Sequence, residues 1–388
     1  MYKSRENSEE TTKVLDIKTR ARIFYIIVFI LIMIFPLIML PFKEKTSDLS
    51  GAYEKQEFSL DNFSEYLKEN LPGREIIIRL LNQVKYTIFD ISGNGTISIG
   101  EDKELFSSES LNYYSHGLYN VDEEAINTLI NKLNLLNDIC NGTGKKLIVT
   151  TTPTKIRYYE DKMPFADIIL NAFENKRYSR PYEVLVDKLK NTNIKYFDCI
   201  QYIDDNIEKL TKDGSSIFPV TGHHWSTFNG KKIGLAFRNY VEQSTSYKLP
   251  KIRIIATPSN IPEYPDADLY DILNLIEKPH GNYYETSVKY DSIELTMPSF
   301  LISGGSFTGE LLLQFFTFGI DNEVIHISNK TCLLDHYEKQ VEFENYSELP
   351  ILESLKNIDI IILEINELNV YNATFGLLDY LLENKNKF

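Results

Sequence analysis

The sequence has 388 residues, of which 43% are hydrophobic and 25% charged, a composition typical of a globular protein with one large domain or two modest ones. The formal net charge of −14 disfavours nucleic-acid binding. Three cysteines, Cys140, Cys199 and Cys332, have no CxxC spacing and no companion histidine at metal-ligand spacing. We therefore expect no zinc site and no disulfide framework.

Residues 23–42, IFYIIVFILIMIFPLIMLPF, form a run of twenty residues without a charge, which is long enough to cross a bilayer as a helix. A cleaved signal peptide would have a shorter apolar run ending in small residues, whereas this one continues into PFKEKTSD. Six Lys and Arg residues precede it and favour a cytoplasmic amino terminus. We expect a single-pass cell-membrane protein with a cytoplasmic tail (1–22), an anchor (23–42), a tether (43–57) and an extracytoplasmic domain (58–388).

The first part of the domain begins with helical apolar spacing at 62–89, which Pro72 and Gly73 divide into two predicted helices. The stretch TISIGEDKELF, residues 96–106, alternates around a turn and predicts a hairpin. Helices and strands then alternate along the chain. The pattern predicts helices at 122–140, 181–191, 204–210 and 226–242, and strands at 145–152 and 194–199.

The second part continues this alternation after an interruption at 248–294, where mixed strand and turn signals indicate an insertion. Further strands are predicted at 299–303, 322–327 and 359–365, with helices at 309–318 and 370–383. Short, continuously apolar strands between helices are typical of a mainly parallel sheet covered on both faces. The predicted fold class is therefore α/β.

A serine lies at the end of one predicted strand, in ISGGSF at 302–307. Gly304 and Gly305 permit a tight turn that presents the Ser306 hydroxyl, because the carboxyl ends of parallel strands are where loops converge. The backbone amides of Ser306 and Phe307 would then be aimed at a developing oxyanion. The alternative is that Ser306 only caps the following helix.

A histidine pair and the only tryptophan occur in TGHHWSTFNG, residues 221–230, directly before a predicted helix. Serine is a poor nucleophile until a base removes its proton, and histidine has a suitable pKa for that role near neutral pH. The alternative is that His223 and His224 are ordinary surface or core residues and that Trp225 serves packing.

Together these motifs resemble those of the AlgX/AlgJ-type SGNH-hydrolase-like family, the extracytoplasmic O-acetyltransferases of bacterial exopolysaccharides. The similarity covers about residues 62–383, with LPGRE, ISIGEDKELF, VTTTPTKIRYYEDKMP, the His-Trp motif, G-x-S-F and IILEINE in the family's order. It implies an SGNH-hydrolase-like fold, Ser306 as the nucleophile that carries the acetyl group, and His224 as the general base. His223 occupies the variable position of the pattern.

The sequence departs from the family at the orienting acid, which usually lies two residues before the base, where this chain has Gly222. A carboxylate from elsewhere could replace it, the His could work without an acid against a backbone carbonyl, or the site could be degenerate. Three carboxylates near predicted strand ends are candidates: Asp198, Glu364 and Glu367. Weaker candidates for substrate binding are Lys155, Tyr158 and Trp225.

The resemblance implies a membrane-anchored O-acetyltransferase that needs no metal or tightly held cofactor. The acceptor would be a cell-surface or secreted polysaccharide, and a polytopic membrane acyltransferase would supply the acetyl group. Three alternatives stay open: an esterase of the same chemistry, a non-catalytic glycan-binding or scaffold subunit of a polysaccharide export complex, and a protein of teichoic-acid modification. Gly222 is the main argument for the non-catalytic subunit.

Overall fold

The computed structural model describes residues 30, 34, 73–114, 121–164, 167–168, 180–291, 297–309, 311, 322–334 and 339–388. The chain divides into two compact units, residues 1–84 and 85–388, and the second contains the sheet and the candidate site. The expected anchor at 23–42 lies outside the described residues, apart from Ile30 and Ile34. In the described ranges, no helix combines the length and apolar character needed to span a membrane.

A seven-stranded sheet forms the centre of the second unit, in the order β10-β9-β8-β7-β11-β3-β4. Its strands are β3 (Lys146–Thr152), β4 (Lys195–Asp198), β7 (Phe300–Ser303), β8 (Val324–Ser328), β9 (Thr331–Leu334), β10 (Lys339–Glu342) and β11 (Ile360–Asn366). The central strand β11 runs parallel to β3 and β7, and these pair in parallel with β4 and β8. Only β9 and β10 join in antiparallel fashion, so the predicted mainly parallel sheet is confirmed.

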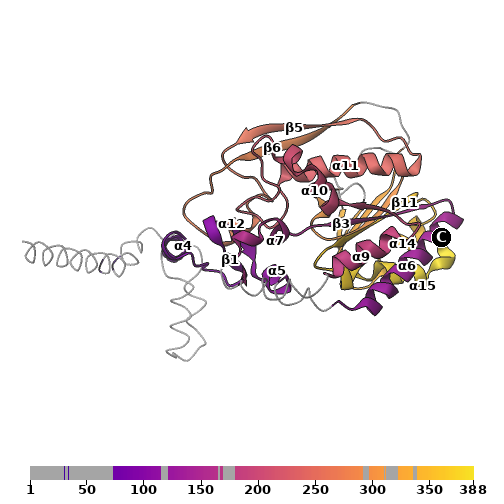
Figure 1. Cartoon of the computed structure of the whole chain (residues 1–388), viewed down its shortest axis with the longest axis horizontal. Helices are drawn as coiled ribbons and strands as arrows, with labels where there is room; N and C mark the ends of the chain where they lie inside the picture. The colour runs from indigo at the N-terminus through magenta and orange to yellow at the C-terminus, as the bar shows by residue number, and fades with distance from the viewer. Residues whose placement is uncertain are drawn as a thin grey trace, which may run out of the picture. The chain divides into compact units, whose positions relative to one another are not determined.

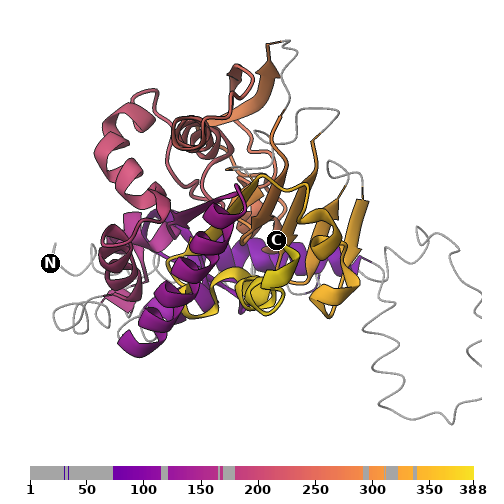
Figure 2. The same cartoon turned by 90° about the vertical axis from the view of Figure 1, so that its right-hand side faces the viewer.

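Helices cover both faces of this sheet (Figures 1 and 2). One face carries α6 (Glu123–Gly142), α9 (Pro181–Lys190), α14 (Ile351–Ser354) and α15 (Leu377–Glu383), and the other carries α10 (Cys199–Thr211) and α11 (Thr227–Thr245). Alternate residues of β11 enter the two cores: Ile361 and Leu363 pack on the first side, Ile360 and Ile362 on the second. Burial on both faces explains why the strand is continuously apolar.

Smaller elements lie outside the main sheet. The predicted hairpin is present as β1 (Ile97–Ile99) and β2 (Leu105–Ser107), preceded by α4 (Arg74–Phe89) and followed by α5 (Ser108–Asn112). A short helix, α7 (Lys155–Tyr158), follows β3. Between α11 and β7, the strands β5 (Ile252–Ser259) and β6 (Tyr283–Tyr290) pair in a separate antiparallel ribbon, with α12 (Asp268–Ile272) between them. Turns of 3-10 helix occupy Glu101–Lys103, Glu160–Lys162, Tyr346–Glu348, Val370–Gly376 and Lys385–Lys387.

Two predicted helices differ from the structure by more than a few residues or in their continuity. Helix α10 begins five residues before its predicted start, because the Asp198 carboxylate accepts hydrogen bonds from the amides of Ile200 and Gln201 and caps it. The last predicted helix is divided into a 3-10 segment and α15, with Gly376 at a φ of 90° between them. The helix predicted before Pro72 and most of the one predicted at 309–318 lie outside the described residues.

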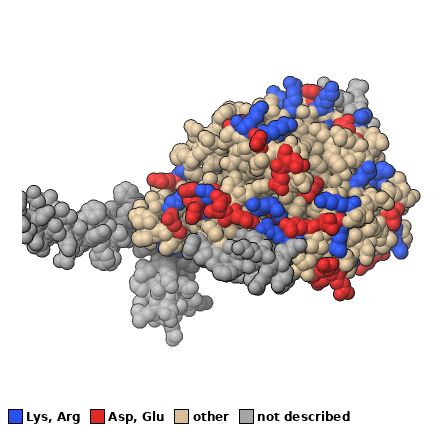
Figure 3. Space-filling view, viewed as in Figure 1, with Lys and Arg blue, Asp and Glu red and all other residues tan. Residues whose placement is uncertain are grey.

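Charged side chains are interspersed on the face of the molecule shown in Figure 3. Blue Lys and Arg residues and red Asp and Glu residues alternate over the described part of this face, without a broad patch of positive charge.

A buried histidine on β8 makes stability depend on pH. His326 is 4% exposed, and its Nε2 lies 2.9 Å from the Thr308 hydroxyl. Burial lowers the pKa of His326 from 6.5 to about 4, so the folded protein keeps the ring neutral in mildly acidic solution.

We predict that acid weakens the fold through this group. Between pH 6.5 and about 4 the unfolded chain binds a proton at His326 that the folded chain does not, so the free energy of unfolding falls as pH is lowered through this window. The loss should be on the order of 3 kcal/mol, measured by denaturant unfolding at several pH values. His326→Gln cannot titrate and should flatten the dependence; an unchanged slope would contradict the prediction.

Candidate active site

The Ser306 segment is a tight turn at the carboxyl end of β7. A Cβ at Gly304 would lie 2.3 Å from Thr308 Cγ2 and 2.7 Å from Glu364 Cβ, so no side chain fits there. The chain turns through Gly305, and Ser306 emerges exposed to solvent. The predicted strand-to-turn junction is therefore confirmed. Whether the amides of Ser306 and Phe307 serve as an oxyanion hole stays a prediction.

Buried polar side chains hold this turn from beneath. The Glu364 carboxylate accepts a hydrogen bond from the Gly305 amide at 2.8 Å and another from the Thr152 hydroxyl. Thr308 donates its hydroxyl to the Gly305 carbonyl at 2.6 Å. Complete burial raises the pKa of Glu364, and the two hydrogen bonds oppose that rise. Glu364 thus supports the backbone beside Ser306.

The His224 imidazole reaches the serine from a loop that leads into α11. Ser226 caps that helix by accepting from the Asn229 amide, which fixes the end of the loop. His224 Nε2 lies 2.6 Å from Ser306 Oγ, although 82 positions separate the two residues. The Phe307 ring packs 5.1 Å from the His224 ring and 5.5 Å from Trp225, measured between centroids. Aromatic packing therefore joins the two motifs.

Asp268, the first residue of α12, occupies the other side of the imidazole. Its Oδ2 lies 2.5 Å from His224 Nδ1, and its Oδ1 accepts from the His223 amide at 2.7 Å. Burial favours a raised pKa for Asp268, but the hydrogen bonds from His224 and His223 outweigh it and hold that pKa below its usual range. Because a carboxylate only accepts, Nδ1 carries the ring proton and Nε2 is free to accept from Ser306. This is the arrangement of a Ser-His-Asp triad.

The three candidate carboxylates are engaged elsewhere, so these candidates are wrong, although a carboxylate from another segment, Asp268, does lie beside His224. Asp198 caps α10 and accepts from the hydroxyls of Thr151 and Tyr182. Glu364 holds the serine turn. Glu367 accepts from the Thr154 amide at 2.6 Å and pairs with Arg157. Each of them satisfies buried backbone or side-chain donors of the sheet end.

Gly222 shows why the acid comes from another segment. A Cβ at this position would lie 2.8 Å from Pro219 Cγ, 3.0 Å from the Asp266 carbonyl oxygen and 3.2 Å from that of Pro265. The segment leading to α12 therefore fills the space that a side chain at 222 would need. Thr221 fastens it by donating its hydroxyl to the Asp266 carbonyl at 2.6 Å. The segment that excludes an acid at 222 supplies Asp268 instead.

No sequence signal singled out Asp268. It is one of eight Asp and Glu residues between 248 and 294, the stretch interpreted as an insertion. Its role depends on packing against the loop that holds His223 and on the neighbouring Asp266, whose carboxylate accepts from the amide and hydroxyl of Thr227, both at 2.7 Å. These contacts span about forty positions and leave no local pattern.

The weak candidates for substrate binding are mostly structural. Lys155 and Trp225 are each 1% exposed, so they cannot touch a substrate, and that expectation is wrong. Tyr158 is half-buried and stacks on Phe218 at 6.0 Å.

The other histidine of the pair, His223, does not contact the serine. Burial lowers the pKa of His223 to about 4, helped by the neighbouring His224. The ring that contacts Ser306 is that of His224.

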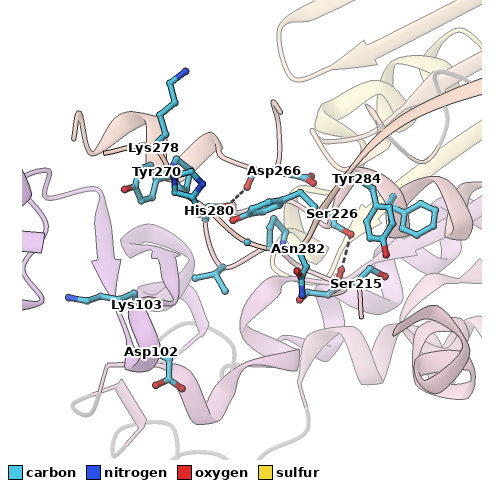
Figure 4. A pocket seen from close by; sticks show the side chains of 18 of the residues that line it. Asp102, Lys103, Ser215, Ser226, Asp266, Tyr270, Lys278, His280, Asn282 and Tyr284 are labelled. Atoms are coloured by element: carbon cyan, nitrogen blue, oxygen red, sulfur yellow. Dashed lines mark hydrogen bonds between the residues drawn. The ribbon is translucent and has the colours of Figure 1, made fainter. Parts of the chain in front are cut away.

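A cavity of about 580 Å³ is lined in part by residues on either side of His224 in the chain, among them Thr221 and Ser226 (Figure 4). Pro219, Val220, Thr221 and Asp266 belong to its wall, and the Phe228 and Tyr284 rings, 4.4 Å apart, lie at one side. Ser306 and His224 do not line it. Across the described ranges no group of three His, Cys, Asp or Glu side chains is placed to hold a metal ion.

Comparison with solved structures finds similar folds at low identity. The O-acetyltransferase domain of Pseudomonas putida AlgJ is 14% identical, with 75% of this chain and 99% of that domain covered and a TM-score of 0.45. Pseudomonas aeruginosa AlgX is 14% identical over 73% of this chain and 67% of its own, with a TM-score of 0.44. Bacillus cereus PatB1 is 11% identical over 71% and 97%, with a TM-score of 0.46.

No model of a protein family matches the sequence. A search of curated proteins finds no match either. Structural similarity at this level carries no weight for the chemistry, which rests on the geometry of Ser306, His224 and Asp268.

We predict that restoring the acid at 222 damages the protein. Gly222→Asp places a side chain against Pro219 and the carbonyls of Pro265 and Asp266, so the segment that carries Asp268 must move. Overpacking of this kind costs about 1–3 kcal/mol, measurable as a lower midpoint of denaturant unfolding. A Gly222→Asp/Asp268→Asn variant that regained the reactivity of wild-type Ser306 would contradict this account.

Proposed function

We propose that this chain is a serine acyltransferase that moves an acetyl group onto a hydroxyl of a polysaccharide. One observation carries the proposal: the His224 imidazole lies within hydrogen-bond distance of both the Ser306 hydroxyl, at 2.6 Å, and the Asp268 carboxylate, at 2.5 Å. An exposed serine with a positioned base and an anionic partner for that base is the arrangement that forms acyl-enzymes.

In the first half-reaction, Ser306 Oγ attacks the carbonyl carbon of the acetyl donor while His224 Nε2 takes the hydroxyl proton. Asp268 stabilises the resulting imidazolium and keeps the ring oriented. The tetrahedral intermediate collapses as its bond to the donor's leaving group breaks, and His224 returns the proton to that group. The amides of Ser306 and Phe307 would hold the negative oxygen.

In the second half-reaction, a sugar hydroxyl attacks the acetyl-Ser306 ester and gives its proton to His224. The bond between the acetyl carbon and Oγ then breaks, His224 protonates Oγ, and the acetylated glycan leaves. If water replaced the sugar hydroxyl, the same steps would make the protein an esterase. The acceptor is decided by how well the bound glycan excludes water from the ester.

The choice of acetyl and of a glycan acceptor comes from the order of the motifs, since the triad geometry fits any acyl transfer. The same resemblance supports an extracytoplasmic domain held by the anchor at 23–42, with a polytopic membrane acyltransferase as acetyl donor and no tightly bound cofactor. Gly222 favoured a non-catalytic scaffold subunit. The position of Asp268 beside His224 supports catalysis over that alternative.

We predict that turnover of 4-nitrophenyl acetate by the full chain depends on the three residues. Ser306→Ala should abolish it, and Asp268→Asn should lower kcat by on the order of 10³–10⁴, because an amide at 268 favours the wrong tautomer of His224. Asp271→Asn is a matched control, since Asp271 is an exposed aspartate of the same helix and loses the same charge. Release of 4-nitrophenol is followed by absorbance.

Equal turnover by wild type and Ser306→Ala would rule out the acyl-enzyme. Transfer is distinguished from hydrolysis by adding an acceptor oligosaccharide to the wild-type reaction and measuring O-acetylated product by mass spectrometry. An esterase releases acetate at a rate that the acceptor does not change.

A further inference from the structure

A buried lysine lies beneath the loop that ends in His224. Lys155 is 1% exposed, and its Nζ donates to the carbonyls of Pro219 at 2.7 Å, Val220 at 3.1 Å and Gly222 at 2.9 Å. An ammonium has three N–H donors, and here these three carbonyls share them with a buried carboxylate, Glu104. One side chain therefore fixes three of the four backbone carbonyls immediately before His223.

The charge of this lysine is balanced by a buried carboxylate. Lys155 Nζ lies 2.6 Å from Glu104 Oε1, and both side chains are almost completely buried. A buried ion pair gains little net stability, because both groups lose their hydration. An apolar pair of similar volume would fill the same space. The carbonyl contacts give a more specific reason for a charge here.

The contacts of Lys155 with Glu104 and with the carbonyls of residues 219–222, called here the lysine clamp, connect three parts of the chain. Glu104 precedes β2, whose first residue Leu105 donates its amide to the Val220 carbonyl at 3.0 Å. Lys155 is the first residue of α7, three positions after the end of the sheet strand β3. The clamped loop runs on to His224, two residues beyond Gly222. The hairpin, the sheet and the loop thus meet at one ammonium. This ammonium holds the loop before His224, and the α11 cap holds it after His224.

We propose that Lys155 is a positioning residue for His224: its ammonium holds residues 219–222 so that the imidazole reaches Ser306 and Asp268 at the same time. This inference rests on the proposed function only for its activity measurements. The position of the ring can be tested independently of activity.

The matched control is a second buried lysine, at the other end of β3. Lys145, directly before β3, is 7% exposed and donates to the Ile358 carbonyl at 2.8 Å. It lies at the amino end of β3, whereas Lys155 follows the carboxyl end. Lys145→Met therefore removes a buried lysine-to-carbonyl bond at the end of the sheet away from the site.

The test compares full-length Lys155→Met/Glu104→Gln with Lys145→Met; the double variant leaves no uncompensated buried charge. The first readout is kcat for 4-nitrophenyl acetate, which should fall about 10–100-fold in the double variant with KM unchanged, because a small displacement of the base impairs attack. The second is the downfield proton NMR resonance of the His224 Nδ1–H bound to Asp268, which the double variant should lose. Lys145→Met should lower only the unfolding midpoint.

A pH profile adds a readout that simple loss of packing would not move. The titratable groups around Lys155 are Glu104, Asp268, His223 and Tyr159. The pKa of Lys155 is lowered to about 8 by burial, while those of His223 and Tyr159 lie at about 4 and 12. Wild-type turnover and the His224 resonance should therefore decline as pH rises through about 8, where Lys155 loses its charge. Glu104→Gln should move this decline to lower pH. Lys155→Arg should remove the decline.

Wild-type kcat and an intact His224 resonance in the folded double variant would overturn the inference. A wild type without the resonance would also overturn it, because the His224–Asp268 bond would then not be held. If the wild type shows the resonance but no turnover, the proposed function fails, and the resonance in the two variants still decides the role of Lys155.

Discussion

The geometry of the site depends on the His224 imidazole being held between two partners that come from distant parts of the chain. Ser306 is presented by a glycine turn after β7, and Asp268 by the start of α12. A hydrogen bond on each ring nitrogen fixes both the orientation and the tautomer, since only an Nδ1 proton leaves Nε2 able to accept from the serine. Displacement of any one of the three segments would break at least one of these contacts.

The layer beneath the site is polar and almost completely paired. Glu364 supports the serine turn, and Lys155 with Glu104 supports the histidine loop. Buried charges are costly unless they are paired or hydrogen-bonded, so apolar residues would stabilise a core at these positions more simply. Their contacts go to backbone atoms beside Ser306 and close to His224. The cost of burying these charged groups is consistent with a role in fixing the positions of Ser306 and His224, because hydrogen bonds are directional and apolar packing is less so.

The carboxylate beside His224 belongs to Asp268 and not to position 222, where the resemblance led us to expect an acid. A carboxylate that orients an imidazole must approach Nδ1 and accept a hydrogen bond from it, and it can do so from any segment that reaches that point. Here Pro265 and Asp266 occupy the volume next to Gly222, which excludes a side chain there, and the carboxylate two residues later reaches the ring. The β5-β6 ribbon and α12 are therefore part of the site, although they lie outside the main sheet.

The sequence by itself determined the fold class, most strands and helices, and the pair Ser306 and His224. Those features have local causes. Apolar runs define strands that are buried on both faces, and a few adjacent residues specify the glycine turn and the capped start of the helix. Only the tertiary structure decided which carboxylate meets His224 and what Lys155 contacts. Both depend on segments forty or more positions apart packing against each other, and the free energy of such contacts comes from shape and burial, which no short stretch of sequence encodes.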